Sequence, residues 1–387
     1  MEYKKLSELC SVAAGGTPKR DRNEYWENGS INWVKIKDIK YRYVTTTQEK
    51  ITQLGLENSS AKIFPKGTIL YTIFATLGEV AILEVDSTTN QAIAGIVPFS
   101  DKIDKDYLYY YLKSIKSKIS SEGRGVAQNN INLEILKNIK IPLRSKITQK
   151  KIADTLDLAS ELIEKRKEQI AEMDKLVQSV YCQINKNETF DTMKVSDVVE
   201  KISTGKSYYS EEISTFKVLK TSAVSYGYFD DSQYKNLPRE YDPPESTFVK
   251  KGDVLVSRMN TEELVGASAY VWKDSDFLTL PDRLWKLHVM ENVDPIYLWK
   301  TLQQSYFRDS IRRNASGTSG SMKNISQKQF MSLKINIPNI LIQKKFASIV
   351  EEIEAQKKLM EESLHEMENN FSALMKKAFR GELFPEE

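Results

Sequence analysis

Two stretches of the chain carry apolar residues in paired series that repeat every seven positions, and neither stretch contains Pro or Gly. The first stretch has Leu156, Ile163, Ile170, Val177 and Ile184, with a second series of Ile152, Ala159, Met173 and Val180. The other stretch has Phe346, Ile353, Met360, Met367 and Leu374, with a second series of Val350, Leu364, Phe371 and Ala378. Arg166 and Lys357 each interrupt one series. Paired series of this kind define a coiled-coil seam, so the pattern predicts two long helices that pack against each other.

The segment before each stretch has the pattern of short strands. Runs such as "FPKGTILYT" from Phe64 and "VKKGDVLVS" from Val249 place β-branched and aromatic residues after a Gly turn. Aromatic-rich helices are expected to follow at Tyr107–Ser120 and Ile296–Arg313. Each segment is therefore predicted to be β-rich, with small helices.

These parts form an internal repeat, which is the signature of duplicated architecture. Gln149 and Gln343 open the same pattern, Gln-Lys-Lys-apolar-Ala, at an offset of 194 residues (343 − 149). At the same offset Lys140-Ile141 matches Lys334-Ile335, and further upstream "KKLSEL" resembles "MKVSDV" with a drifting offset. We expect each Gln to position the first turn of its helix and the lysines that follow it to face phosphate.

The repeat and the seams together predict an α+β fold. Two β-rich domains with small helices are expected to be separated and joined by two long antiparallel coiled-coil helices, which gives a pseudo-two-fold internal repeat. The expected boundaries are 1–146 for the first domain, 147–187 for the first helix, 188–341 for the second domain, 342–380 for the second helix and 381–387 for a C-terminal tail.

Composition is typical of a soluble globular protein, with 40% hydrophobic and 28% charged residues. No apolar run approaches the ~20 residues that a membrane helix needs, and the N-terminus lacks the apolar core of a secretory signal. Cys10 and Cys182 are the only cysteines, too few for a disulfide framework. We therefore expect a cytoplasmic protein with no membrane partner.

The distribution of charge is more informative than the net charge of +3. The segment Ser310–Val350 has seven basic residues and no Asp or Glu, and the matching segment Gly123–Ala153 has seven basic residues and one acid, Glu134. A single basic run is typical of a solvated surface. Runs at matching places in both copies favour a surface that binds nucleic acid.

Two motifs resemble parts of nucleotide-dependent enzymes, but both are incomplete. Gly205-Lys206-Ser207 could end a phosphate-binding P-loop, yet the glycine that must open that loop is replaced by Glu200. The Asp-Pro-Pro sequence that begins at Asp242 is typical of amino-methyltransferases, but Glu245 stands where the aromatic that stacks on the base should be. Neither motif predicts catalysis here.

Nuclease and metal motifs are also incomplete. Pro281–Arg283 could begin a nuclease metal site, but no Glu-x-Lys follows within the next dozen residues. The two histidines, His288 and His365, do not form a ligand set at metal-site spacing. The sequence therefore predicts a binding protein, not an enzyme, with no directly bound cofactor or metal.

Nearly the whole chain resembles the specificity (S) subunits of type I restriction–modification systems. Gly15-Gly16-Thr17-Pro18, Trp26 and Trp33–Asp38 are similar to the start of a target recognition domain in that family, and the joints around the two Gln-Lys-Lys patterns are similar to the starts of its spacer helices. The closing "AFRGELF" also fits. The second front departs from the first, with Thr204-Gly205-Lys206 in place of Gly-Gly-Thr-Pro.

The resemblance implies two target recognition domains that each read one half of a split sequence in double-stranded DNA. It implies two methyltransferase subunits that carry S-adenosylmethionine and dock on the helices, where Leu158, Leu162 and Leu359 offer extra apolar surface, and restriction subunits that use ATP and Mg²⁺. The helices would then set the gap between the half-sites. A helix of about 35 residues is ~52 Å long, which spans roughly 15 base pairs.

Residues that contact DNA are expected among Arg, Lys, Asn and Gln on loops of the two domains and at the basic joints. The candidates are Lys19, Arg20, Lys35, Lys37, Gln128 and Asn129 in the first copy, and Arg258, Asn260, Arg283, Arg312 and Lys323 in the second.

Three alternative functions stay open from sequence. The chain could be the DNA-recognition adaptor of a related restriction or phage-defence system, which neighbouring genes would reveal. It could be a non-catalytic coiled-coil scaffold for other proteins, whose binding would depend little on salt, whereas DNA binding weakens steeply as salt rises. It could be an enzyme with an unrecognised site, which would show activity as an isolated chain.

Overall fold

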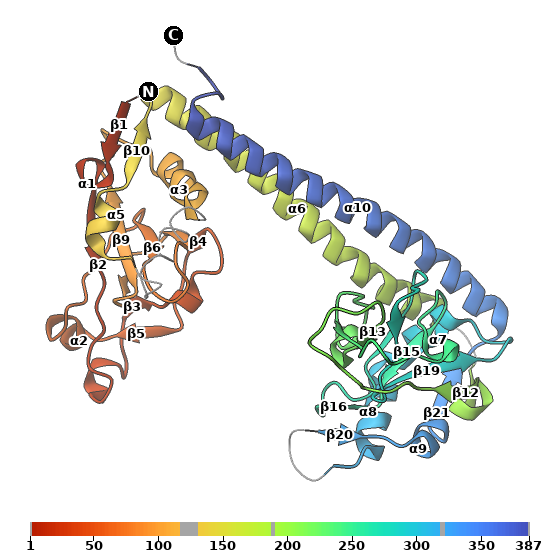
Figure 1. Ribbon diagram of the computed structural model, residues 1–387. Helices are drawn as coiled ribbons and strands as arrows, with labels where there is room; N and C mark the ends of the chain where they lie inside the picture. The colour runs from red at the N-terminus through yellow and green to blue at the C-terminus, as the bar shows by residue number, and fades with distance from the viewer. Residues whose placement is uncertain (1, 117–130, 187–189, 318–321, 386–387) are drawn as a thin grey trace. The chain divides into compact units, whose positions relative to one another are not determined.

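The structure of the chain is a computed structural model that describes residues 2–116, 131–186, 190–317 and 322–385 (Figure 1). The chain divides into two compact units, Met1–Glu168 with Glu361–Glu387, and Gln169–Met360. The long helices α6 (Lys146–Asn185) and α10 (Ile340–Arg380) each contribute one part to each unit. Each unit is therefore a β-rich domain packed on a pair of helix segments.

The first unit is built on three sheets and several short helices. Its five-stranded sheet has the order β2 (Cys10–Ala14), β9 (Ile93–Pro98), β6 (Ile69–Thr72), β7 (Val80–Leu83) and β4 (Tyr43–Val44). A three-stranded sheet has the order β5 (Glu49–Ile51), β3 (Ile31–Val34) and β8 (Thr88–Thr89), and β1 (Glu2–Lys5) pairs with β10 (Lys140–Leu143). The short helices are α1 (Leu6–Leu9), η1 (Asn23–Tyr25), η2 (Ile36–Asp38), α2 (Gln53–Glu57), α3 (Lys105–Ser114) and α5 (Leu133–Lys137).

The second unit repeats this topology. Its four-stranded sheet has the order β12 (Val199–Ser203), β19 (Leu284–Val289), β15 (Val254–Ser257) and β17 (Ser268–Tyr270). The three-stranded sheet is β14 (Tyr234–Asn236), β13 (Lys217–Leu219) and β18 (Leu278–Thr279), β11 (Asp191–Lys194) pairs with β21 (Lys334–Ile337), and β16 (Met259–Asn260) pairs with β20 (Lys323–Asn324). The helices are η4 (Val195–Asp197), η5 (Thr221–Val224), η6 (Glu245–Thr247), α7 (Pro295–Leu302), α8 (Ser305–Asn314) and α9 (Gln327–Met331).

The internal repeat predicted from sequence is confirmed strand by strand. β3 pairs antiparallel with β5 and parallel with β8, and β13 pairs antiparallel with β14 and parallel with β18. β1 pairs antiparallel with β10, and β11 pairs antiparallel with β21. β10 and β21 are the strands that lead into the long helices. Among the described residues the copies differ at two places. The first copy adds β4 at the edge of its larger sheet, and the second has the β16–β20 ribbon as a separate two-stranded sheet.

Within each unit the two helix segments run antiparallel and close the core. In the first unit Ile152 and Leu156 of α6 share a cluster with Ala378 of α10, so the start of one helix meets the end of the other. In the second unit Val177 of α6 shares a cluster with Phe346 of α10, so the end of one meets the start of the other. The predicted antiparallel seam is therefore confirmed.

The small helices differ from the expectation at two points. The pattern predicts a helix over Tyr107–Ser120, but α3 ends at Ser114 and Ile115 is its C-cap. The sequence pattern predicts a single helix over Ile296–Arg313, but the structure has two, α7 and α8, because Gln304 is extended at ψ 145°. The side chain of Gln303 donates to the Gly227 carbonyl oxygen at 2.6 Å, and Gln304 donates to the Lys300 carbonyl oxygen at 2.9 Å. These tertiary and capping bonds end α7 where no Pro or Gly signals a break.

Candidate nucleic-acid interface

Gln149, which opens the repeated sequence pattern, joins α6 to the first domain. Its side chain is fully buried. The amide oxygen accepts from the Asp104 backbone N–H at 2.6 Å, and the amide nitrogen donates to the Arg144 carbonyl oxygen at 2.9 Å. Asp104 in turn caps α3 by accepting from the backbone N–H groups of Asp106 and Tyr107. One glutamine therefore connects the joint, the cap of α3 and the first turns of α6.

Gln343 makes the same connection in the second unit. It is 2% exposed, accepts from the Asp294 backbone N–H at 2.9 Å and donates to the Pro338 carbonyl oxygen at 2.8 Å. Asp294 caps α7 as Asp104 caps α3. The expectation that each glutamine positions the first turn of its helix is confirmed, and we refer to the two arrangements as the glutamine brackets.

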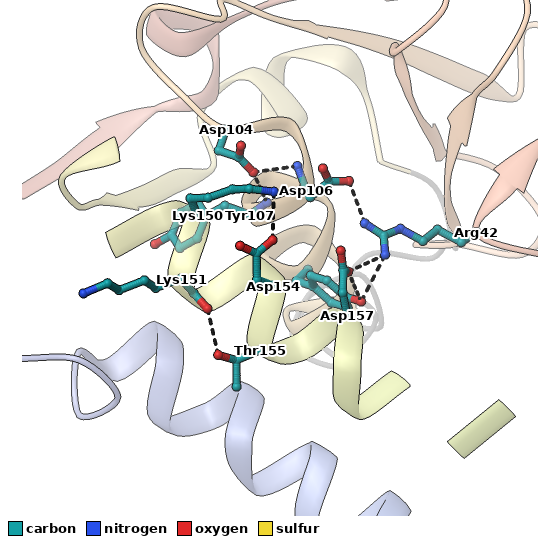
Figure 2. Close-up of polar contacts among 10 residues, drawn as sticks. Arg42, Asp104, Asp106, Tyr107, Lys150, Lys151, Asp154, Thr155 and Asp157 are labelled. Carbon is teal, nitrogen blue, oxygen red and sulfur yellow. Dashed lines mark hydrogen bonds and ion pairs between the residues drawn. The ribbon is translucent and has the colours of Figure 1, made fainter. Parts of the chain in front are cut away.

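Figure 2 shows the two lysines that follow Gln149, and it places Lys150 beside Asp104. Lys150 forms an ion pair with Asp154 at 2.8 Å within α6. Lys151 is exposed, and its carbonyl oxygen accepts from the Thr155 hydroxyl at 2.8 Å. A contact between these lysines and phosphate stays a prediction.

A second attachment in the first unit is centred on Arg42, just before β4. Its guanidinium pairs with Asp106 of α3 at 2.6 Å and with Asp157 of α6, as Figure 2 shows, and the Tyr110 hydroxyl donates to Asp157 at 2.6 Å. Burial alone would lower the pKa of Arg42, but the Asp157 carboxylate outweighs it and raises that pKa. The arginine therefore stays charged and holds the segment before β4 against both helices.

The sequence candidates Arg20 and Lys35 meet around one carboxylate in the first domain. Glu49 of β5 pairs with Arg20 at 2.7 Å and with Lys35, and the Arg20 guanidinium lies 3.7 Å from the ring centre of Trp26 and 4.6 Å from that of Trp33. Partial burial alone would raise the pKa of Glu49, but the two cations lower it overall. Both cations are thus paired with one carboxylate, which leaves the cluster a net positive charge, and their contact with DNA stays a prediction.

Lys19 and Lys37 are exposed in the same domain. Lys37 lies in a cleft of about 270 Å³ that Lys40, Tyr41 and Tyr43 also line. Tyr41 is 78% exposed, so an aromatic ring and two lysines face solvent together. Gln128 and Asn129, the other candidates in this copy, lie outside the described residues.

In the second domain the β16–β20 ribbon brings three candidates together. Asn260 is directly opposite Lys323 in the ladder. The Arg258 carbonyl oxygen accepts from the Ile325 backbone N–H at 3.0 Å, so Arg258 adjoins the same ribbon. Among the described residues, the buried Arg258 Nε and the Oδ1 of Asn324 have no hydrogen-bond partner.

Two more candidates lie on neighbouring elements. The Arg258 backbone N–H donates to the Arg283 carbonyl oxygen at 3.0 Å, which links the ribbon to the loop before β19. Arg312, on α8, pairs with Asp309 at 2.9 Å. Four of the five candidates in this copy are therefore connected through backbone contacts, and Arg312 is tied to its own helix.

Arg283 also lines a larger cleft, of about 450 Å³, that sequence reasoning did not anticipate. The cleft contains Tyr208, Tyr209, Lys220 and Lys235. The sequence signal that could have indicated this cleft was the aromatic pair Tyr208-Tyr209, which directly follows Gly-Lys-Ser. That segment was considered only as a P-loop.

The Gly-Lys-Ser segment is explained by close backbone packing. A Cβ atom on Gly205 would lie 1.8 Å from the Leu280 carbonyl oxygen, and the Gly205 backbone N–H donates to the Pro281 carbonyl oxygen at 3.2 Å. Glycine is required there because the chain crosses directly over the end of β18. The hydroxyl of the neighbouring Ser207 donates a hydrogen bond to the Asp282 carboxylate.

The family to which this architecture belongs follows from comparison of the sequence. The family model of the type I restriction modification DNA specificity domain matches residues 1–172 and 187–369, one match for each copy of the repeat. The chain belongs to this family. The resemblance seen in the sequence is therefore confirmed for both copies, including the second front, which departs from the first.

Relatives of this specificity-domain family match parts of the chain. The chain is 34% identical over 185 residues to the type I restriction enzyme MjaIX specificity subunit of Methanocaldococcus jannaschii, covering 46% of this chain and 42% of that protein. It is 29% identical over 163 residues to the EcoR124I/EcoR124II specificity subunit of Escherichia coli, covering 41% and 40%. The matches thus span less than half the length of these curated relatives.

Solved structures of the family share the fold over the whole chain. The S subunit of a type I system from M. genitalium aligns with TM-score 0.55 at 16% identity, covering 98% of this chain and 96% of that one. A chain from a structural study of type I R-M complex assembly and conformational transition aligns with TM-score 0.61 at 16% identity, covering 99% and 98%.

Two further features of the described residues concern metal binding and membrane insertion. No group of three or more His, Cys, Asp or Glu side chains in them is placed to hold a metal ion. None of the helices in the described ranges is long and apolar enough to cross a membrane. On the long helices, Leu158, Leu162 and Leu359 are 63%, 56% and 65% exposed, which confirms the apolar surface expected there.

Proposed function

We propose that this chain is the sequence-recognition subunit of a type I restriction–modification enzyme and that each β-rich domain reads one half of a split site in double-stranded DNA. The observation that carries this proposal is the duplicated unit. The same fold is attached to the start of each long helix by the same buried glutamine. Two equivalent domains, each attached through its own glutamine bracket, are suited to a DNA site with two half-sites.

The electrostatics of both domains support DNA as the ligand. Lys37 and Lys40 share one cleft with exposed tyrosines, and Arg283 shares another. Cations beside aromatic rings suit a phosphate backbone with bases next to it. Asn260 and Lys323 of the ribbon are of the residue types that contact base edges and phosphates. The remaining proposed DNA contacts are Lys19, Arg20, Lys35, Gln128, Asn129, Arg258 and Arg312. Arg20 and Lys35 would act from their cluster around Glu49.

The proposed partners supply the chemistry. Two methyltransferase subunits carrying S-adenosylmethionine would dock on the long helices, where Leu158, Leu162 and Leu359 are exposed, and restriction subunits would supply ATP- and Mg²⁺-dependent cleavage. The chain itself would hold no cofactor. Its role is to direct the partners to a sequence and to set the distance between the half-sites.

Methylation mapping tests the proposal. Genomic DNA from cells with and without this chain is compared while the methyltransferase partner is present. We expect one split motif to be methylated only when the chain is present. The purified complex should then prefer a duplex with that motif over a scrambled duplex of equal length. Identical methylation patterns, or equal affinity for both duplexes, would contradict the proposed function.

A further inference from the structure

The cleft of the second domain gathers positive charge from three separate segments. Lys220 precedes η5, Lys235 lies on β14, and Arg283 lies in the loop before β19. All three are exposed, and the described lining of the cleft contains no Asp or Glu. Side chains so distant in sequence converge only because the three-stranded sheet brings their segments together.

These cations lack the counter-charges that are common elsewhere in the protein. Among the described residues, no ion pair is found for Lys220, Lys235 or Arg283. The interaction seen for Lys235 is with the face of Tyr209, 5.0 Å from its ring centre. Like charges that converge without ion-pair partners repel one another in the free protein, and an anion that enters the cleft removes that repulsion.

The corresponding sheet of the first domain provides a contrast. There Glu49 stands on β5, the counterpart of β14, and pairs with both Arg20 and Lys35. On this strand the first domain therefore has a carboxylate that pairs with nearby cations, whereas the second domain has Lys235 on the corresponding strand.

The geometry points to a backbone phosphate of DNA as that ligand, and we propose that Lys220, Lys235 and Arg283 hold one phosphate beside Tyr208 and Tyr209. This inference rests on the proposed function. Lysines are flexible point charges that suit a tetrahedral anion, and the planar guanidinium of Arg283 can bind two phosphate oxygens at once. Phosphate contacts fix the position of a protein on the duplex and carry no sequence information. The cleft thus positions the second domain on its half-site without reading sequence.

A phosphate contact has a distinctive signature in binding data. The logarithm of the association constant falls linearly with the logarithm of salt concentration, and each phosphate contact contributes about 0.9 to the slope. Loss of one contact therefore weakens binding by about the same factor for every sequence and reduces the slope by about 1. Loss of a base contact changes the ratio between sequences instead.

The experiment measures DNA affinity of the complete complex across a salt series. The probes are a duplex that carries the mapped motif and a scrambled duplex of equal length. The variant K220Q/K235Q/R283Q should reduce the slope by about 1 on both duplexes and leave their affinity ratio unchanged. K273Q is the matched control, because Lys273 is an exposed lysine of the same domain that is already paired with Asp231 at 2.6 Å. Its slope should match that of the wild type.

Each result separates this inference from the proposed function. An unchanged slope in the triple variant, while the wild type still prefers its motif, overturns the phosphate site alone. A changed affinity ratio between the duplexes also overturns it, because the cleft then reads bases. A reduced slope in a complex that has no sequence preference supports the phosphate site and contradicts the proposed function. Melting temperatures of all variants confirm that they are folded.

Discussion

Replacing Gln343 with Met removes both hydrogen bonds of the second glutamine bracket while keeping a side chain of similar length. Gln343 is 2% exposed, so water does not readily replace the lost partners. The Asp294 backbone N–H and the Pro338 carbonyl oxygen would both lose their bonds to this side chain. The first belongs to the cap of α7 and the second to the joint that leads into α10.

The expected cost follows from these two groups. Leaving a buried donor or acceptor unsatisfied costs about 1–3 kcal/mol for each group, so Q343M should lower the unfolding free energy of the second unit by about 2–6 kcal/mol. The methionine recovers a small part of this by burying an apolar chain. The same substitution at Gln149 should have a similar effect on the first unit, because its two bonds are equivalent and it is fully buried.

Urea denaturation of the full chain measures the stability, and hydrogen exchange of the Asp294 amide measures the bracket locally. In Q343M this amide should lose protection. Q356M is the matched control, because Gln356 lies on the same helix with an exposed side chain, and its stability should stay within about 0.5 kcal/mol of the wild type. A cost below about 0.5 kcal/mol in Q343M, with unchanged protection at Asp294, would refute the bracket as a structural link.

Two further predictions concern charge and length. Lys35 and Arg20 lower the pKa of Glu49 despite the opposing effect of burial. The ion pairs of Glu49 therefore stabilise the protein above the ordinary glutamate pKa of 4.5, and this stabilisation is lost as the pH falls below that value. The difference in melting temperature between the wild type and E49Q should therefore shrink as pH is lowered through this range, and a constant difference would argue against the ion pairs. Inserting four residues after Gln169 and four after Met360 adds ~6 Å to each helix and should widen the gap of the methylated motif by roughly two base pairs; an unchanged gap would exclude the helices as the spacer.

Local pattern was sufficient for the parts of this fold that depend on periodicity. The seams around Leu156 and Phe346 are buried as the seven-residue spacing predicted, because the face that a residue occupies on a helix is fixed by its position along the chain. The repeated glutamines were also visible in sequence. Their partners, Asp104 and Asp294, were not identified, because these bonds join residues about 45 to 49 positions apart.

The candidate site was less accessible from sequence. Lys37 and Arg283 are exposed, and their contact with DNA stays a prediction. Residue type alone did not separate them from Lys35, which pairs with Glu49. The same limitation hid Lys220 and Lys235, which resemble any other surface lysines until the sheet places them beside Arg283.

The sequence by itself determined that this protein is two copies of one unit, each with a β-rich front and a heptad helix, because composition and spacing are properties of neighbouring residues. Only the tertiary structure decided which cations are free to meet a ligand. Electrostatic energy depends on distance through space. The carboxylate that pairs with Arg20 comes from a strand 29 residues away (49 − 20), whereas the corresponding strand of the second domain supplies Lys235.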